Sequence, residues 1–372
     1  MVLVQVEVVV AATSLLSKFR QRSYFLVSVI VFTLAFQWTA IAGSTVTLMT
    51  HYYNLTPGLT ITKPILSYEN RMSLDTTINA KLTVDRVVTD YEGIDSVSGA
   101  SQHVGELTSS VDTRQEYVVS AAQIIGDWTL SAAYLQSVEK DYLSHAPSIG
   151  VAKDFNRRNT TLSMGYAHNF DTVNGQYMDD EEGKDVDNYS VSLTQILSRH
   201  SLMQLGYTLQ NNEGYLSTGN RQIVLENDLT FDEFLPSTRL RQAIAARYAH
   251  WFPTRTAIHF GYRIYQDDWE LNSNTLEFKV YQQLSKRLKF RGEVRLYEQT
   301  EVEFMKSSYT GTEQYLTSAS TLTAFSSQLY GLKLEYSPRS LADSQFQLKY
   351  ERYEQSRGLT GDIFMLAAEL VY

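Results

Sequence analysis

The sequence predicts an all-β fold: a transmembrane antiparallel up-and-down β-barrel of about 16 strands, within a range of roughly 14 to 16, preceded by a signal peptide. Three observations lead to this prediction. The N-terminal region carries an export signal, the remainder is a succession of segments in which apolar and polar residues alternate, and the short and long connections between these segments fall at opposite ends.

The composition limits the classes of protein to consider. The chain has 372 residues and a formal charge of −9, which disfavours binding to nucleic acid. It contains no cysteine, which excludes disulfides, thiolate metal sites, covalently attached c-type haem and a lipid-modified N-terminal cysteine. Tyrosine is abundant, with 25 residues, and proline is rare, with 6, as is typical of strand-rich proteins.

The export signal lies between residues 18 and 42. Three basic residues precede an apolar run from Tyr24 to Phe36, and Ala40-Ile41-Ala42 supplies small residues at the positions that a signal peptidase reads. We therefore expect residues 1–42 to be a signal peptide cleaved after Ala42, and residues 43–372 to form a single outer-membrane barrel domain. A permanent N-terminal anchor helix is the alternative, because the run approaches the roughly 20 residues that a membrane span needs.

The mature region divides into alternating segments bounded by turn signals, which is the pattern of an outer-membrane barrel. The predicted strands are 45–53, 59–68, 74–88, 112–125, 127–138, 142–154, 159–171, 188–198, 202–212, 239–252, 255–267, 274–285, 288–301, 321–336, 344–356 and 362–372. Alternation is clearest from Leu276 to Leu296, where apolar residues occupy the even positions and charged residues occupy many of the odd ones. Such strands expose one apolar and one polar face.

The connections between the predicted strands are sorted by length. Those after even-numbered strands are mostly tight, such as Gly126-Asp127 and Pro253-Thr254. The long ones, at 89–111, 172–187, 213–237 and 302–320, all follow odd-numbered strands. Short turns facing the periplasm and long loops facing outside produce this sorting in outer-membrane barrels, whereas a soluble sandwich or propeller has no reason for it. The apolar faces are therefore expected to contact lipid.

The last strand ends on an aromatic residue. Phe364, Leu366, Leu370 and Tyr372 share one face, and a C-terminal aromatic residue of this kind resembles the signal read by the barrel-assembly machinery. An exposed tyrosine at the end of an apolar edge strand would be a liability in a soluble protein.

If the apolar face contacts lipid, the other face lines a lumen. The charged lumen candidates come from the last seven strands, with nine basic and five acidic residues: Arg241, Arg247, Arg263, Glu277, Lys279, Lys289, Arg291, Glu293, Arg295, Lys333, Glu335, Lys349, Glu351 and Glu369. Earlier strands supply mainly Ser and Thr, such as Thr161 and Ser190. Either the basic wall favours anionic solutes in a water-filled passage, or the charges pair across strands and fill a polar interior.

Two loops contain unusual composition. The 213–237 loop is rich in apolar residues (Ile223, Val224, Leu225, Leu229, Phe231 and Phe234), so it either folds into the barrel mouth or forms an extracellular hairpin packed on its own residues. An acidic cluster (Asp179, Asp180, Glu181, Glu182, Asp185 and Asp187) lies in the 172–187 loop. A solvated acidic loop is favoured over a divalent-cation site, because the spacing is not that of an EF-hand. No metal or cofactor site is predicted.

Motifs for catalysis are missing from the sequence. It has no G-x-S-x-G, H-E-x-x-H, P-loop or G-x-G-x-x-G motif, and its seven histidines are scattered. We expect a protein that is not an enzyme. A lipid-acting barrel hydrolase is a third alternative, because it could assemble its site across strands without any linear motif.

Several stretches resemble an uncharacterised family of Gram-negative outer-membrane proteins known only as domain of unknown function 3570. They are Asp95–Ser101 (DSVSGAS), Asp112–Arg114 (DTR), Glu139–Ala167 (EKDYLSHAPSIGVAKDFNRRNTTLSMGYA), Tyr265–Asn274 (YQDDWELNSN) and Tyr350–Gln355 (YERYEQ). The resemblance spans most of the mature chain. It implies a barrel in the outer membrane and implies no activity.

The function that the sequence favours is a passive, porin-like channel in the bacterial outer membrane with a polar, partly basic lumen. The alternative is a non-conducting structural or assembly barrel that anchors periplasmic or surface partners. In either case the expected partners are outer-membrane lipid and lipopolysaccharide, the barrel-assembly machinery and a periplasmic protein.

Overall fold

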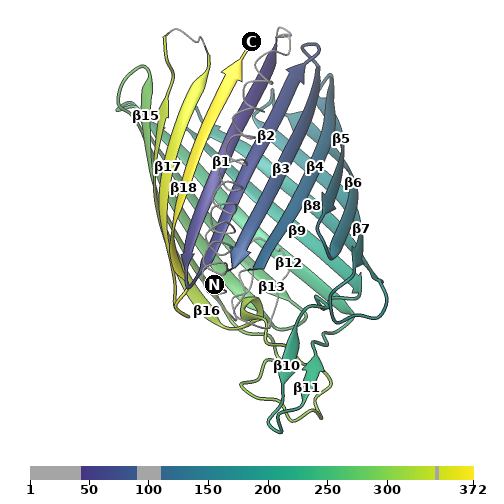
Figure 1. The fold of residues 1–372 in the computed structure, drawn as a ribbon. Helices are drawn as coiled ribbons and strands as arrows, with labels where there is room; N and C mark the ends of the chain where they lie inside the picture. The colour runs from purple at the N-terminus through teal and green to yellow at the C-terminus, as the bar shows by residue number, and fades with distance from the viewer. Residues whose placement is uncertain (1–42, 90–109, 340–342) are drawn as a thin grey trace, which may run out of the picture. The chain divides into compact units, whose positions relative to one another are not determined.

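A computed structural model describes residues 43–89, 110–339 and 343–372. Sixteen antiparallel strands form a closed barrel in the order β1-β18-β17-β16-β15-β14-β13-β12-β9-β8-β7-β6-β5-β4-β3-β2 (Figure 1). The first and last strands close it, with Thr45 opposite Val371 and Thr56 opposite Thr360. The predicted fold class is confirmed. The predicted signal peptide, residues 1–42, lies outside the described residues.

The barrel strands follow the predicted segments closely. They are β1 (Ser44–Thr56), β2 (Leu59–Arg71), β3 (Thr76–Thr89), β4 (Ser110–Ile125), β5 (Trp128–Val138), β6 (Tyr142–Phe155), β7 (Thr160–Val173), β8 (Glu182–Ser198), β9 (Ser201–Gly214), β12 (Thr238–Phe252), β13 (Thr256–Asp267), β14 (Asn272–Gln283), β15 (Leu288–Gln299), β16 (Phe325–Tyr336), β17 (Gln345–Gln355) and β18 (Thr360–Val371). Outside the barrel lie β10 (Gln222–Val224), β11 (Thr230–Asp232) and the 3₁₀ helix η1 (Ser320–Leu322).

One predicted boundary was wrong in a way that matters. Strand β8 begins at Glu182, six positions before the predicted start, so the second half of the acidic cluster is not in a loop. Its backbone is paired on both sides: Glu182 lies opposite Val173 of β7, and Lys184 lies opposite Gly214 of β9. Paired strands on both sides therefore outweigh the unfavourable composition of an acidic segment.

No helix in the described part of the chain is long and apolar enough to span a membrane.

The outer face of the barrel is apolar. A band of exposed aliphatic and aromatic side chains follows the outward positions of the strands, including Val119, Leu130, Ile149, Val191, Ile244, Phe278, Leu332, Leu348 and Leu366. A closed barrel leaves no unpaired edge and satisfies its backbone hydrogen bonds internally, so it is one of the two structures that can span a bilayer. The apolar band is the surface that lipid covers.

Aromatic residues mark both borders of this band. On the long-loop side, outward tyrosine hydroxyls are each hydrogen-bonded to a polar group nearer the rim: Tyr117 to Gln115, Tyr134 to His145, Tyr166 to Asp187, Tyr207 to Gln242, Tyr262 to Asn274, Tyr330 to Gln328 and Tyr350 to Asp362. The short-turn side carries exposed Trp128, Phe155, Phe252, Tyr336 and Phe346. Such girdles are typical of the two membrane interfaces.

The long connections within the described residues lie at one rim, as predicted. The turns after β2, β4, β6, β8, β12 and β14 are short, and they share their rim with the end of β18 (Figure 1). The long segments 215–237 and 300–324 leave from the other rim, and the predicted long connection 89–111 lies almost entirely outside the described residues. Short turns face the periplasm in outer-membrane barrels, so the long-loop rim is the extracellular one.

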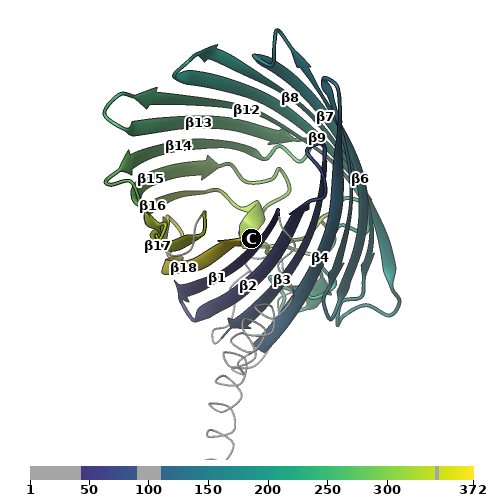
Figure 2. The ribbon, with the colours of Figure 1, turned by 90° about the horizontal axis from the view of Figure 1, so that it is seen from above.

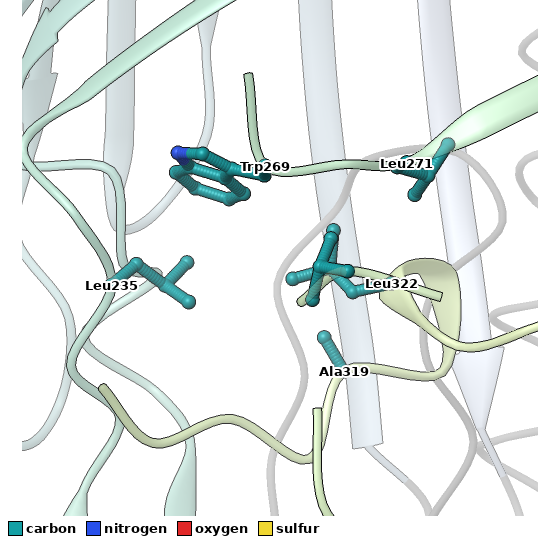
Figure 3. Packing of buried hydrophobic residues seen from close by; sticks show 6 residues of the cluster. Leu235, Trp269, Leu271, Ala319 and Leu322 are labelled. Atoms are coloured by element: carbon teal, nitrogen blue, oxygen red, sulfur yellow. The ribbon is translucent and has the colours of Figure 1, made fainter. Parts of the chain in front are cut away.

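Two long loops pack together at the extracellular rim. We call residues 215–237 and 300–324 the loop cap. Leu235 of the first loop and Val302, Ala319 and Leu322 of the second form a buried cluster with Trp269 and Leu271 of the β13–β14 turn (Figure 3). The β10–β11 hairpin projects beyond the barrel (Figure 1), and its Ile223 packs with Tyr309 and Leu316. The apolar loop therefore forms a hairpin, which packs on the neighbouring loop and not on its own residues alone.

Candidate channel lumen

The thirteen charged lumen candidates on β12–β17 occupy the inward positions of their strands. The register sets them side by side in rows across the wall. One row runs from Glu277 to Arg295, and the next from Lys279 through Glu293 to Gly331 and Glu351. Their neighbours along each strand, such as Phe278 and Leu332, are the exposed outward residues. The barrel interior is seen end-on in Figure 2. Whether these residues line a conducting path remains a prediction.

Ion pairs neutralise much of this wall on β14 and β15. The Lys279 ammonium lies 2.8 Å from Glu277 Oε1 and 3.9 Å from Glu293 Oε2. The guanidinium of Arg291 lies 3.2 Å from the same Glu293 carboxylate. These charges cancel locally.

Ion pairs continue on β15 to β17. The ammonium groups of Lys289 and Lys333 lie 2.5 and 2.9 Å from the two oxygens of Glu335. Lys349 lies 2.8 Å from Glu351. The interpretation that charges pair and fill a polar interior therefore describes this part of the lumen.

Four inward arginines are different. In the described ranges, Arg241, Arg247, Arg263 and Arg295 form no ion pair with a carboxylate. Arg241 donates a hydrogen bond to the amide oxygen of Gln210 at 3.1 Å, and the guanidinium of Arg263 lies over the Tyr265 ring at 5.4 Å. Arg247, Arg263 and Arg295 are exposed. Their positive charges remain available to the lumen.

The wall opposite the charged strands carries small neutral residues. Strands β4 to β9 present mainly Ser, Ala, Gly, Asn, Thr and Gln inward, and a cavity of about 870 Å³ lies against them. It is lined among others by Ser120, Ser148, Gly165, Ser190, Asn188 and Gln210. Arg241 and Arg263 border the same cavity. The sequence predicted this neutral wall from residues such as Ser190.

A buried ionic cluster at the extracellular end of the lumen was missed. The Asp85 side chain is 0% exposed, with one oxygen 2.6 Å from Arg114 Nη2 and the other 3.1 Å from Lys63 Nζ. Glu139 lies 3.9 Å from the Nε of Arg114. Asp85 stands in a strand of mixed composition, and only the register with β4, which puts it opposite Arg114, reveals the pair.

The other predicted residues behave as follows. In β18, Phe364 and Leu366 are exposed on the outer face, whereas Leu370 is buried. Their predicted role as an assembly signal, together with Tyr372, stays a prediction. Inward Glu369 lies opposite Gln345. His259, an inward histidine of β13, packs against Tyr281 with ring centroids 4.7 Å apart.

Comparisons with known proteins agree with this architecture. A family model described as "Protein of unknown function (DUF3570)" matches residues 8–181 and 174–366. No curated protein matches the sequence. A solved structure described as "Bacterial polysaccharide outer membrane secretin" is similar with a TM-score of 0.50 and 8% identity, covering 89% of this chain and 99% of that one. At that identity the likeness shows the fold alone.

Two further solved structures are similar to this chain at lower TM-scores. OccK8 (OprE) of Pseudomonas aeruginosa has a TM-score of 0.46 and 9% identity, covering 89% of this chain and 99% of that one. A loop L8 deletion mutant of OmpT from Vibrio cholerae has a TM-score of 0.47 and 9% identity, covering 88% and 97%. The closed barrel with its apolar band is that of a protein of the bacterial outer membrane.

Proposed function

Because the chain belongs to the DUF3570 family, whose function is unknown, we propose its function from the lumen itself: it is a passive, porin-like channel that favours anionic solutes. The observation that carries this proposal is the set of four inward arginines that have no carboxylate partner within residues 43–89, 110–339 and 343–372. Charged groups in a narrow part of a pore set its selectivity. Ion-paired residues contribute little to the field, whereas uncompensated arginines attract anions.

Pore space supports the same proposal. Sixteen strands normally enclose an aqueous channel, because side chains cannot fill so wide an interior. The small residues on β4 to β9 leave a cavity of about 870 Å³, and Arg241 and Arg263 stand at its edge. A solute would therefore pass between a neutral wall and a line of arginines.

A second candidate function is a non-conducting barrel that anchors a surface partner. The β10–β11 hairpin favours it, because Val224, Leu229 and Phe231 are exposed at the far end of the loop cap and Phe234 is exposed beside them. An exposed apolar patch on a projecting hairpin is suited to binding another protein. Lipopolysaccharide, the barrel-assembly machinery and a periplasmic partner remain proposals for both functions, and we propose no enzymatic activity.

Conductance in planar lipid bilayers tests the channel. The purified, heat-modifiable barrel should give stepwise currents and a reversal potential that indicates anion preference in a salt gradient. The lumen candidates carry a net excess of four positive charges. Arg295→Glu lowers this net charge by two, so it should roughly halve the ratio of anion to cation permeability.

The matched control removes an ion pair and keeps the net charge. In Arg291→Gln/Glu293→Gln, one positive and one negative group that lie 3.2 Å apart are lost together. This double variant should keep the reversal potential of the parent. Absence of stepwise current would reject the channel and leave the anchoring barrel, and an unchanged reversal potential in Arg295→Glu would reject the anion preference.

A further inference from the structure

Three carboxylates meet at the extracellular end of the barrel. Asp112 stands near the start of β4, and Glu139 and Asp141 belong to the connection between β5 and β6. One oxygen from each of the three side chains lies within 4.8 Å of the others. Two oxygens bound to the same Ca²⁺ ion can be up to about 5 Å apart, because each bond is about 2.3–2.6 Å long. The spacing is therefore that of ligands around one ion.

Two of these side chains are buried with an oxygen that has no partner. The Glu139 side chain is 4% exposed, and its Oε2 accepts no hydrogen bond. Asp141 is also buried; one oxygen accepts a hydrogen bond from the Asn220 amide, and its Oδ1 accepts none. A buried carboxylate oxygen without a donor is costly, and buried charges in proteins are normally paired or coordinate metals.

The charge balance around the three carboxylates is negative. With Asp85 they make four acidic groups, against two basic ones, Lys63 and Arg114, both of which contact Asp85. Lys140 is exposed and makes no ion pair in the described part of the chain. Burial, followed by the neighbouring Asp112 charge, raises the pKa of Glu139 to about 8, and only Arg114 opposes this among the charged groups that act on it. When all four carboxyl groups are ionised, they exceed these two basic groups of the described residues by two negative charges, which is the charge that one divalent cation would neutralise.

We propose that Asp112, Glu139 and Asp141 bind a hard divalent cation, for which Ca²⁺ is the best-suited ion. Clustered carboxylates are the ligands that such ions prefer, and Ca²⁺ tolerates the irregular geometry that three side chains from a strand and a turn provide. The site faces the extracellular side, where modules that bind Ca²⁺ commonly do so with dissociation constants of about 10⁻⁴–10⁻³ M.

Bound cation would fasten the extracellular loops to the barrel. Asp141 joins three of them, because its backbone oxygen accepts a hydrogen bond from Asn174 N at 2.9 Å and its carboxylate accepts one from Asn220 of the loop cap. Asn220 in turn accepts a bond from Gln176 N at 2.7 Å. An ion held between Asp112 and Asp141 therefore couples β4 to the β7–β8 loop and to the loop cap.

Calorimetric titration of the full-length, EDTA-treated barrel in detergent with CaCl₂ tests the proposal. The parent should show one saturable site with a dissociation constant of about 10⁻⁴–10⁻³ M. Binding should be lost in Glu139→Gln and in Asp141→Asn. The control is Asp180→Asn, which changes an exposed residue of the acidic cluster in the neighbouring loop and should bind as the parent does.

Heat-modifiability on gels gives a second readout. CaCl₂ should raise the temperature at which the compact form of the parent unfolds, and it should not do so for Glu139→Gln. In EDTA, Glu139→Gln should be at least as heat-resistant as the parent, because it removes a buried carboxyl group whose Oε2 accepts no hydrogen bond. Three results would each overturn the site: no saturable binding by the parent, binding by Glu139→Gln and Asp141→Asn as tight as that of the parent, or loss of binding in Asp180→Asn alone. A Glu139→Gln variant less heat-resistant than the parent in EDTA would show that the Glu139 carboxylate stabilises the barrel by pairing with Arg114 and not by binding a cation.

Discussion

Asp267 at the end of β13 accepts five hydrogen bonds, which the sequence around it does not predict. One oxygen accepts two bonds from the Arg239 guanidinium, at 3.0 and 2.5 Å, and one from the Tyr265 hydroxyl at 2.6 Å. The other accepts the backbone N–H groups of Trp269 and Leu271 at 3.0 Å each. The side chain is 0% exposed. This carboxylate therefore ties β12 to the turn on which the loop cap packs.

Replacing Asp267 with Asn should destabilise the barrel by about 3–5 kcal/mol, because the buried Arg239 guanidinium loses its only negative partner in the described structure. Urea unfolding from lipid vesicles, followed by tryptophan fluorescence, measures the change. Asp268→Asn is the control: Asp268 is exposed, and its bond from Leu240 N can be accepted equally by an amide oxygen. If the two variants were equally stable, the Arg239–Asp267 pair would have no such role.

At the scale of single elements, the loop cap is held by side chains that fold a long segment into a fixed shape. Glu313 accepts hydrogen bonds from Lys306 Nζ at 3.0 Å and from the backbone N–H groups of Thr310 and Gly311 at 3.1 and 2.9 Å. Gly311 has a φ of 86°, and an added Cβ would lie 2.7 Å from Leu225 Cδ1. A glycine is thus needed where the two loops of the cap meet.

The turn at Glu313 should loosen in acid. Desolvation by burial raises the pKa of this carboxyl, but the bonds from Lys306 and the backbone outweigh it and lower the pKa to about 2. A lowered pKa stabilises the folded loop above the ordinary value of 4.5, and this contribution is lost as the pH falls from about 4.5 to about 2.

Hydrogen exchange of residues 306–313 between pH 5 and pH 2, corrected for intrinsic rates, measures this loosening. In Glu313→Gln the same peptide should exchange at an elevated corrected rate that does not change with pH. Glu301→Gln, at an exposed position of the same loop, should behave as the parent. Protection of the parent peptide that persists down to pH 2 would contradict the assignment.

For the whole molecule, barrel closure divides every strand into a lipid side and a lumen side. Ser148 and Ile149 stand next to each other in the middle of β6 and both border the interior cavity, yet Ile149 is 65% exposed, with its side chain on the outer face. Closure also removes free edge strands, whose unpaired backbone groups could otherwise pair with another chain. The two faces of one strand are therefore in different solvents.

An arginine should have opposite consequences at these two positions. Ile149→Arg places a charge near the bilayer midplane and should cost about 2–4 kcal/mol, measured by urea unfolding from vesicles. Ser148→Arg should leave that stability nearly unchanged and lower the single-channel conductance, because the new side chain enters the cavity. Equal destabilisation by both variants would mean that the faces have been assigned wrongly.

The strands and their faces were predictable because they depend on alternation within one segment. The hairpin from Leu276 to Leu296 illustrates this, since its apolar and charged positions separate on the two faces as expected. The sorting of short and long connections also survives errors of a few residues in strand ends. Strand β8 was the exception, because its first residues are held by pairing with β7 and β9 and not by their own composition.

Interactions between distant segments were not predictable, because they depend on register and on where each side chain ends. Arg291 and Arg295 look alike in sequence, yet only Arg291 has a carboxylate partner in the described structure. Asp112, Glu139 and Asp141 come together only when β4 and β5 are laid side by side in the observed register. Alternation along a strand is a local property, so it can be read from the sequence. The distance between two charges on different strands depends on the tertiary structure and cannot be read in this way. The proposed selectivity and the proposed cation site both depend on such distances.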